Sequence, residues 1–403
     1  MSLLKTGILI SRRGFLISIV LFTLFLTLYS ILSLLLVKHI NPFPEHRSIV
    51  QASFNFVIAF SLVVSSFFIG RTVKLHCIYI SLTSILIMIA LIPFISNNVA
   101  TLGVVLAIGC FFGTGLLAFL TYFWNLTVPE ERGRIAGLIG FVALPIYSIA
   151  NIVMASLDFL GTVTATALLS SGIILVIFLR PERLALTSKK DERRNYAEKR
   201  TVILYAIPWI AFSLINVTLA RNASLAIVQG LSPSFHISLI LYQTAGIIFG
   251  ALFGGIAADF LGRRELLISS LTLYGISAVL VGLFTNGEIL ILAYAINGLS
   301  WGVLFILYTM VIWGDLSTQN NCALIYSIGL AIYYATAGIG FATQVSIPIF
   351  TSSLVSCLLV FLSNVPIAFA PELLPSEFSE RIKLKLHIRK VKKIREKSRD
   401  YGK

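Results

Sequence analysis

Residues 180–200 have the sequence RPERLALTSKKDERRNYAEKR and divide the chain into two very apolar halves. Six long apolar stretches precede this charged segment and six follow it. Of the 403 residues, 57% are hydrophobic and only 12% are charged. A soluble core cannot bury so much apolar surface, whereas a bilayer takes up about 20 apolar residues in each helical pass. The sequence therefore predicts an all-α membrane protein with 12 transmembrane helices in two sets of six.

The ends of the apolar stretches predict the spans and the domains. We expect spans at 14–37, 49–70, 75–95, 100–122, 133–154 and 159–179, and then at 201–220, 236–257, 266–285, 289–312, 322–343 and 347–369. The predicted units are an N-terminal six-helix bundle (1–179), a basic linker (180–200), a C-terminal six-helix bundle (201–370) and a basic tail (371–403).

The distribution of lysine and arginine predicts the orientation. The net charge is +14, which in a soluble protein would suggest a nucleic-acid partner. Here, however, only Lys38, Arg47 and Arg221 fall in loops on the side opposite to the central segment. By the positive-inside rule, both termini and the linker are cytoplasmic. We therefore expect a multi-pass protein of the cell membrane with no nucleic-acid partner.

Two loops at equivalent places in the halves share a short pattern. VPEERGRIAGLIG begins at Val128, and STQNNCALIYSIG begins at Ser317. When the two are aligned, Ile139–Gly140 matches Ile328–Gly329 at the entry to the next helix. Together with the six-plus-six pattern, this indicates an internal duplication.

The sharpest local motif is GGIAADFLGRRELL, which starts at residue 254 and contains Gly255, Asp259, Gly262, Arg263 and Arg264. The glycine before the arginines permits a tight turn with positive φ, and the arginines suit the inner membrane interface. The aspartate ends a helix, where the dipole disfavours negative charge, so it requires a compensating partner. The alternative is a plain helix stop with arginines that only set the topology.

This G-x-x-x-D-x-x-G-R-R pattern resembles the signature of the major facilitator superfamily between the second and third helices of each half. PEERGRIAGL (129–138) is similar to the loop that follows the fourth helix in that family, and APELLP (370–375) to its closing segment. The resemblance implies a transporter built from two six-helix bundles. In the first half of this chain, Phe67 stands where Asp259 would align, so that half lacks the aspartate.

The resemblance also implies a gating role for the motif. Asp259 would face the start of the fifth helix across the seam between the bundles. There, Glu131, Arg132 and Arg134 form the partner loop, and either arginine could hold the aspartate.

In the family, helices 1, 4, 7 and 10 line a central path, so polar and aromatic side chains on these helices and on helix 8 are cavity candidates. They are Thr27, Tyr205, Trp209, Asn216, Gln243, Tyr294, Asn297 and Trp301. Asparagine in hydrocarbon needs a hydrogen-bond partner, so Asn216 and Asn297 should face protein or water. The alternative is that the aromatic residues only pack or form an interfacial belt.

The other sequence features exclude several classes of function. No acidic residue falls in the middle of a predicted span, which favours facilitated diffusion or coupling through the charge of the substrate. No phosphate loop, zinc spacing or nucleophilic triad is found, and the four cysteines form no CxxC pair. We expect no enzyme activity, no cofactor and no metal, and a small-molecule substrate bound by a monomer.

The basic tail (371–403) predicts membrane lipids as a further partner. Residues 381–403 carry 11 basic side chains, which suit an anionic inner leaflet. A solvated tail that only sets the topology is the simpler alternative. Two other functions for the whole chain also stay open: translocation of lipids or amphiphiles, and a receptor or scaffold that binds without transport.

Overall fold

The computed structural model describes residues 10–39, 46–69, 74–92, 98–156, 198–216, 232–284, 286–343 and 348–374, with a few positions between 161 and 179. All regular elements in these parts of the chain are helices, as predicted. In the first half they are α1 (Arg12–His39), α2 (His46–Phe68), α3 (Lys74–Leu91), α4 (Asn98–Leu126) and α5 (Pro129–Ser156). In the second half they are α8 (Lys199–Leu214), α10 (Pro233–Leu261), α11 (Arg263–Leu283), α12 (Gly287–Ile306), the π-helix η4 (Leu307–Ile312), α13 (Trp313–Asp315), α14 (Cys322–Thr343) and α15 (Ile349–Phe369).

Within the described residues, nine helical segments are long and apolar enough to cross a membrane, and α3 contains a shorter apolar one. One of the nine is the continuous run of α12, η4 and α13. Each expected span corresponds to a helix except 159–179, most of which lies outside the described residues. The central segment up to residue 197 and the basic tail from 375 also lie outside them.

Several helices extend beyond the apolar stretches that predicted them. The fifth helix begins at Pro129 instead of residue 133, with proline at the first position, where its missing N–H costs no hydrogen bond. The eighth predicted span, 236–257, corresponds to α10, which continues to Leu261. Charged and polar residues can continue a helix past the hydrocarbon, so helix ends and membrane boundaries differ by about one turn.

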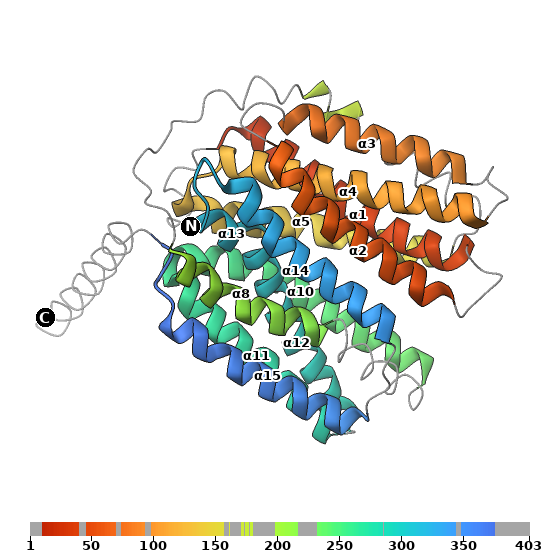
Figure 1. Ribbon diagram of the computed structural model, residues 1–403. Coiled ribbons are helices and arrows are strands. Elements are labelled where there is room, and N and C mark those ends of the chain that lie inside the picture. The colour runs from red at the N-terminus through yellow and green to blue at the C-terminus, as the bar shows by residue number, and fades with distance from the viewer. Residues whose placement is uncertain are drawn as a thin grey trace, which may run out of the picture.

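The helices form two groups, one made of α1–α5 and the other of α8–α15 (Figure 1). The main contacts between the groups are α2 with α14 and α5 with α10, and η4 also touches α5. In Figure 1, α14 lies beside α2 between the two groups. These pairs define the seam that any relative movement of the two groups must change.

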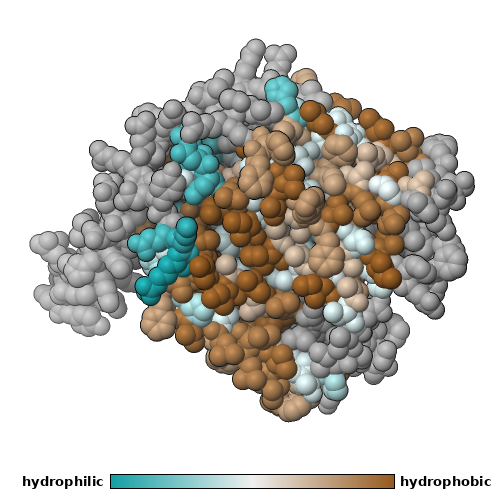
Figure 2. All heavy atoms as spheres, in the orientation of Figure 1, coloured by the Kyte–Doolittle hydropathy of each residue, from teal (hydrophilic) through white to brown (hydrophobic). Residues whose placement is uncertain are grey.

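The outer surface is apolar in the middle and polar at one end. Figure 2 shows hydrophobic side chains across the centre of this face, with most of the strongly hydrophilic side chains at the left of the view. Large apolar side chains are exposed on the surface of the protein, including Phe60 at 69% and Leu362 at 67%, as expected where lipid replaces water. We call the end where α5 and α11 begin and α10 finishes the basic end, because Arg134 and Arg264 lie there.

Glycines bring α10 and α12 into backbone contact. A Cβ atom added at Gly250 would lie 2.9 Å from the carbonyl carbon of Leu299. One added at Gly298 would lie 2.9 Å from the carbonyl carbon of Gln243. Small residues allow such close approach in membranes, where packing drives helix association. The second group is therefore held together by a glycine-lined contact.

We predict that Gly250→Ala lowers the stability of the protein by about 1–3 kcal/mol, because the added methyl overlaps the backbone of α12. Gly103→Ala on α4 is the matched control, since nothing lies within 4 Å of its added Cβ. That control should be neutral or stabilising by about 0.5–1 kcal/mol. Thermal unfolding of both purified variants tests this, and equal melting temperatures would contradict the packing argument.

Candidate functional site

Asp259 lies at the end of α10 and accepts hydrogen bonds from the start of α5. Its Oδ1 accepts from the backbone N–H of Gly133 at 3.0 Å, and its Oδ2 accepts from the backbone N–H of Arg134 at 2.8 Å. The Nε of Arg134 also donates to Oδ2, at 3.1 Å. The carboxylate is fully buried, and it occupies a helix N-terminus, where free N–H groups and the dipole favour an anion. The structure thus brings Asp259 to the place that the family resemblance implies.

The close approach of α10 to α5 depends on glycines in both helices. A Cβ atom added at Gly255 would lie 2.5 Å from the Cα of Gly137. One added at Gly137 would lie 2.9 Å from the Cα of Gly255. Gly255 is therefore required for the close approach of the two helices, because any side chain at this position would push the carboxylate of Asp259 away from α5.

A chain of buried charges extends from this contact. Arg263 Nη2 lies 3.0 Å from Asp259 Oδ1, and Arg263 Nε lies 3.0 Å from Asp315 Oδ2. Arg132 Nη1 pairs with the other oxygen of Asp315. We call these four residues together with Arg134 the charged cluster; three of its members, Arg132, Arg134 and Asp315, lie at most 9% exposed, and the other two are fully buried. The cluster joins α5 of one group to α10, α11 and α13 of the other.

Arg263 and Arg132 also donate hydrogen bonds to oxygens outside the ion pairs. Arg263 donates to the carbonyl oxygens of Ala258 and Pro129, both at 2.6 Å. Arg132 donates through Nε to Thr127 Oγ1 at 3.1 Å and through Nη2 to Thr127 O at 3.3 Å. Buried charges are tolerated when they are paired and hydrogen-bonded. The arrangement meets both conditions across the seam.

A second carboxylate, that of Glu372, holds the turn that places the arginines. Its Oε1 accepts from the backbone N–H of Arg263 at 2.8 Å, and its Oε2 accepts from that of Arg264 at 3.0 Å. Gly262, between α10 and α11, has φ 101, and a Cβ there would lie 2.6 Å from Glu372 Oε2. The N-terminus of α11 is therefore capped by a side chain from beyond α15. Arg264 forms no ion pair with another described residue, and its Nη1 donates to Ala370 O at 3.4 Å.

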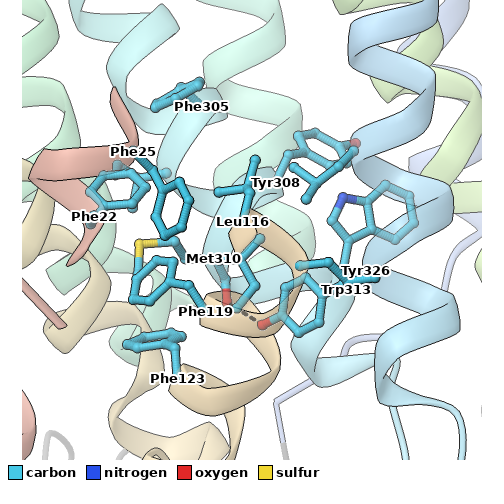
Figure 3. Packing of buried hydrophobic residues seen from close by; sticks show 14 of the residues in the cluster. Phe22, Phe25, Leu116, Phe119, Phe123, Phe305, Tyr308, Met310, Trp313 and Tyr326 are labelled. Atoms are coloured by element: carbon cyan, nitrogen blue, oxygen red, sulfur yellow. Dashed lines mark hydrogen bonds between the residues drawn. The ribbon is translucent and has the colours of Figure 1, made fainter. Parts of the chain in front are cut away.

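A layer of apolar side chains separates the charged cluster from the middle of the protein. In Figure 3, Met310 of η4 points toward Phe25 and Phe119, with Phe22 and Phe123 nearby. These five side chains, which we call the apolar layer, come from α1, α4 and η4, and all are at most 3% exposed. The layer thus closes the space between the two groups on the side of the basic end.

Hydrogen bonds fix η4 and α13, which form the end of the helical run that begins with α12. Tyr326 donates its hydroxyl to Met310 O at 2.8 Å, drawn as a dashed line in Figure 3. Trp124 Nε1 donates to Gly314 O at 2.8 Å and so links α4 to α13. A π-helix displaces the side chains that follow it and is often found at functional sites. Here it precedes the turn that carries Asp315.

A cavity of about 100 Å³ lies between the two groups. Its walls come from α1, α4 and α5 on one side and from α12 and α14 on the other. The lining side chains are Phe22, Phe25, Leu26, Tyr29, Phe112, Leu116, Leu144, Tyr147, Trp301, Phe305, Tyr333 and Tyr334. Three quarters of these described lining residues are aromatic, and none of them is charged.

One of the predicted cavity residues, Trp301, lines this cavity, and two others lie behind the lining. Trp301 Nε1 donates to Asn216 Oδ1 at 2.9 Å, so that asparagine has its partner in protein. Trp209 stacks on Tyr308 with ring centroids 4.6 Å apart and on Tyr333 at 5.6 Å. Trp209 also donates its indole N–H to Gly329 O at 2.7 Å.

The other predicted cavity residues lie elsewhere in the structure. Gln243 donates to Asn297 Oδ1 at 2.9 Å, which links α10 to α12 within the second group. Tyr294 packs in a separate small apolar cluster, and Tyr205 donates to Pro371 O at 2.8 Å. Thr27 bonds its hydroxyl back to Thr23 O of its own helix at 2.8 Å. Their contact with a substrate stays a prediction.

Sequence reasoning did not assign a role to two residues of the site. Asp315 lies just beyond the predicted span 289–312 and received no role there, whereas it pairs with two arginines of the cluster. Glu372 was noted as part of a closing segment, and its role in capping α11 was not expected. Of the partner loop, Glu131 is buried in the first turn of α5. In the first half, Phe67 is 74% exposed, so no buried counterpart of Asp259 stands at that position.

Comparisons with known proteins agree with this architecture. Residues 211–363 match the family described as "Sugar (and other) transporter". A curated relative, "D-xylose-proton symporter-like 2" of Arabidopsis thaliana, is 27% identical over 139 residues, which are 31% of this chain and 27% of the relative. The chain therefore spans about a quarter of the length of that relative.

Solved structures match over most of the chain. The human organic anion transporter MFSD10 aligns with a TM-score of 0.68 and 13% identity, covering 87% of this chain and 99% of that one. The proton:xylose symporter XylE aligns with a TM-score of 0.68 and 12% identity, covering 90% and 96%. The fucose:proton symporter FucP of E. coli aligns with a TM-score of 0.63 and 13% identity, covering 89% and 98%. The expected resemblance is confirmed at the level of the fold: this chain has the architecture of a major facilitator superfamily transporter.

Proposed function

We propose that this protein is a transmembrane transporter that carries a small organic solute by alternating access. The observation that carries the proposal is a cavity between two helical groups that is closed on one side by the apolar layer and the charged cluster. Both closures consist of contacts between the groups, so both must separate for the cavity to open toward the basic end.

The proposal includes the orientation and the number of helices. The basic end is cytoplasmic, since arginines gather there, and the two termini lie on the same side. Twelve spans in two sets of six, in a monomer in the cell membrane, are consistent with the described helices. The tail beyond residue 380 interacts with anionic lipids of the inner leaflet through its basic side chains.

The charged cluster acts as the gate in this proposal. In the closed state, Asp259 accepts three hydrogen bonds from α5. When the groups separate at the basic end, the carboxylate gains water but loses these bonds and the dipole of α5. The closed state is then favoured until substrate binding offsets the difference.

Asp259→Asn should favour the open state, because the amide cannot replace both charged oxygens. The reporter is Met310→Cys in a background free of other cysteines, since Met310 is fully buried in the apolar layer. If the closed state loses about 1–3 kcal/mol relative to the open state, the cysteine at position 310 should react about 5–150-fold more with an impermeant thiol reagent applied from the basic side.

Glu265→Gln is the matched control for this experiment. Glu265 is an exposed carboxylate in the first turn of α11, close in sequence to the motif. The control should label at the parental rate. Unchanged labelling of the Asp259→Asn variant would rule out a gating role for the aspartate.

Asp315→Asn should lower the melting temperature more than a surface substitution, because Arg132 then loses its buried charge partner. Leaving one buried charge unpaired costs about 3–5 kcal/mol. Arg132→Met in the same chain should recover part of the loss, giving a coupling of about 0.5–3 kcal/mol in a double-mutant cycle. Strictly additive losses in thermal unfolding would show that the two residues do not depend on one another.

A further inference from the structure

The cavity has a chemical character that does not suit a sugar. Nine of its lining side chains are aromatic rings and three are leucines. Among the described residues that line the cavity, none carries a carboxylate, an amine or a side-chain amide. The hydrogen-bonding groups that remain are those of tyrosine and tryptophan.

Several of these polar groups already have partners. Trp301 Nε1 donates to Asn216 at 2.9 Å, and the Tyr29 hydroxyl donates to Asn55 Oδ1 at 3.1 Å. A sugar would bring many hydroxyl groups to a wall whose described side-chain polar groups are four tyrosine hydroxyls and one indole N–H. Each buried hydroxyl left unpaired costs about 1–3 kcal/mol, so a sugar would lose more hydration than it regains.

Several of the lining rings meet edge to face around Tyr334. Tyr334 lies at 67° to Tyr29, at 80° to Phe112 and at 86° to Tyr333, with centroids 5.6, 6.2 and 5.5 Å apart. On α12, in the same group as Tyr333 and Tyr334, Trp301 and Phe305 are stacked with centroids 4.6 Å apart. Such edges and faces suit a guest ring, since each aromatic pair adds about 0.5–1.5 kcal/mol beyond area burial.

The volume of the cavity and the lack of charged side chains in its described lining narrow the class of substrate further. Its 100 Å³ is of the order that accepts a benzene-sized molecule in dry apolar cavities. Cation–π contacts give an ammonium about 2 kcal/mol each when desolvated, while removing the ion from water costs several kcal/mol without a carboxylate to pair with it. The two aspartates of the charged cluster are already paired with arginines.

We propose that the site of this transporter takes an uncharged, largely apolar molecule that carries a ring, and not a sugar or an organic cation. The inference rests on the proposed function, because it assigns the substrate class to the same cavity. The aromatic walls, together with the lack of charged and amide side chains among the described lining residues, decide the selectivity.

The test uses three brominated probes on the full-length protein in lipid nanodiscs, since bromine quenches nearby tryptophan fluorescence. The probes are 4-bromobenzyl alcohol, its ammonium counterpart 4-bromobenzylammonium, and 6-bromo-6-deoxy-D-glucose. Trp301 is the tryptophan of the cavity wall. We expect saturable quenching by the alcohol at a concentration at least about 10-fold lower than by the other two, a difference of about 1.4 kcal/mol.

Two matched variants locate the binding. Trp301→Phe should lose the saturable quenching, whereas Trp209→Phe should keep it, although each variant loses one buried indole hydrogen bond. Equal or stronger quenching by the sugar or the ammonium probe would overturn the inference. Saturable quenching that survives in Trp301→Phe would place the binding elsewhere and also overturn it.

The outcome is independent of the gating experiment, which needs no ligand. Failure of the probes with normal gating would reject the substrate class and leave transport in place. Failure of gating with selective probe binding would reject alternating access through the charged cluster and leave the binding site.

Discussion

The contact between Asp259 and the start of α5 is the constraint on which the closed arrangement depends. It requires a helix N-terminus with free N–H groups, a carboxylate at the end of a facing helix, and no side chains between the two backbones. Gly137 and Gly255 supply the last of these. Once the backbones touch, the aspartate is shielded from water, and each of its hydrogen bonds is stronger than it would be at a surface.

The rest of the charged cluster follows from burying that one carboxylate. Arg263 of α11 balances the negative charge of Asp259. A buried arginine in turn needs further hydrogen-bond acceptors of its own. Asp315 supplies one and connects Arg132 to the same chain. Arg132 and Arg134 come from the first group, and Asp259, Arg263 and Asp315 come from the second, so the complete cluster is formed only when both groups are in place. This makes it suited to one state of a two-state movement and poorly suited to intermediates.

The sequence predicted the helices and the motif contact well, because both depend on local patterns. Apolar length predicts a span, and a carboxylate at a helix end needs a partner whatever the fold. Asp315 was harder, since the predicted span ended at residue 312 while the helical run continues through η4 to Asp315. The π-helix also breaks the periodicity from which a buried face is deduced. The cavity could not be predicted from polar stripes on single helices, because its walls are aromatic residues such as Phe112 and Tyr334, brought together only by packing between groups.

The two main seams between the groups correspond under the predicted duplication, yet they are built differently. In that repeat, α2 and α10 are both second helices, and α5 and α14 are both fifth helices, so α2 with α14 is the counterpart of α10 with α5. The second seam carries the buried charges. In the first, Phe67 is exposed and Gly338 faces the ring of Phe56 at about 3.0 Å from its would-be Cβ. Among the described residues, no ion pair joins α2 to α14, so this seam can slide without the rehydration of a paired charge. In the proposed alternating access, the free-energy difference between the two states is therefore concentrated at the seam between α5 and α10, where a few buried ions respond to small separations.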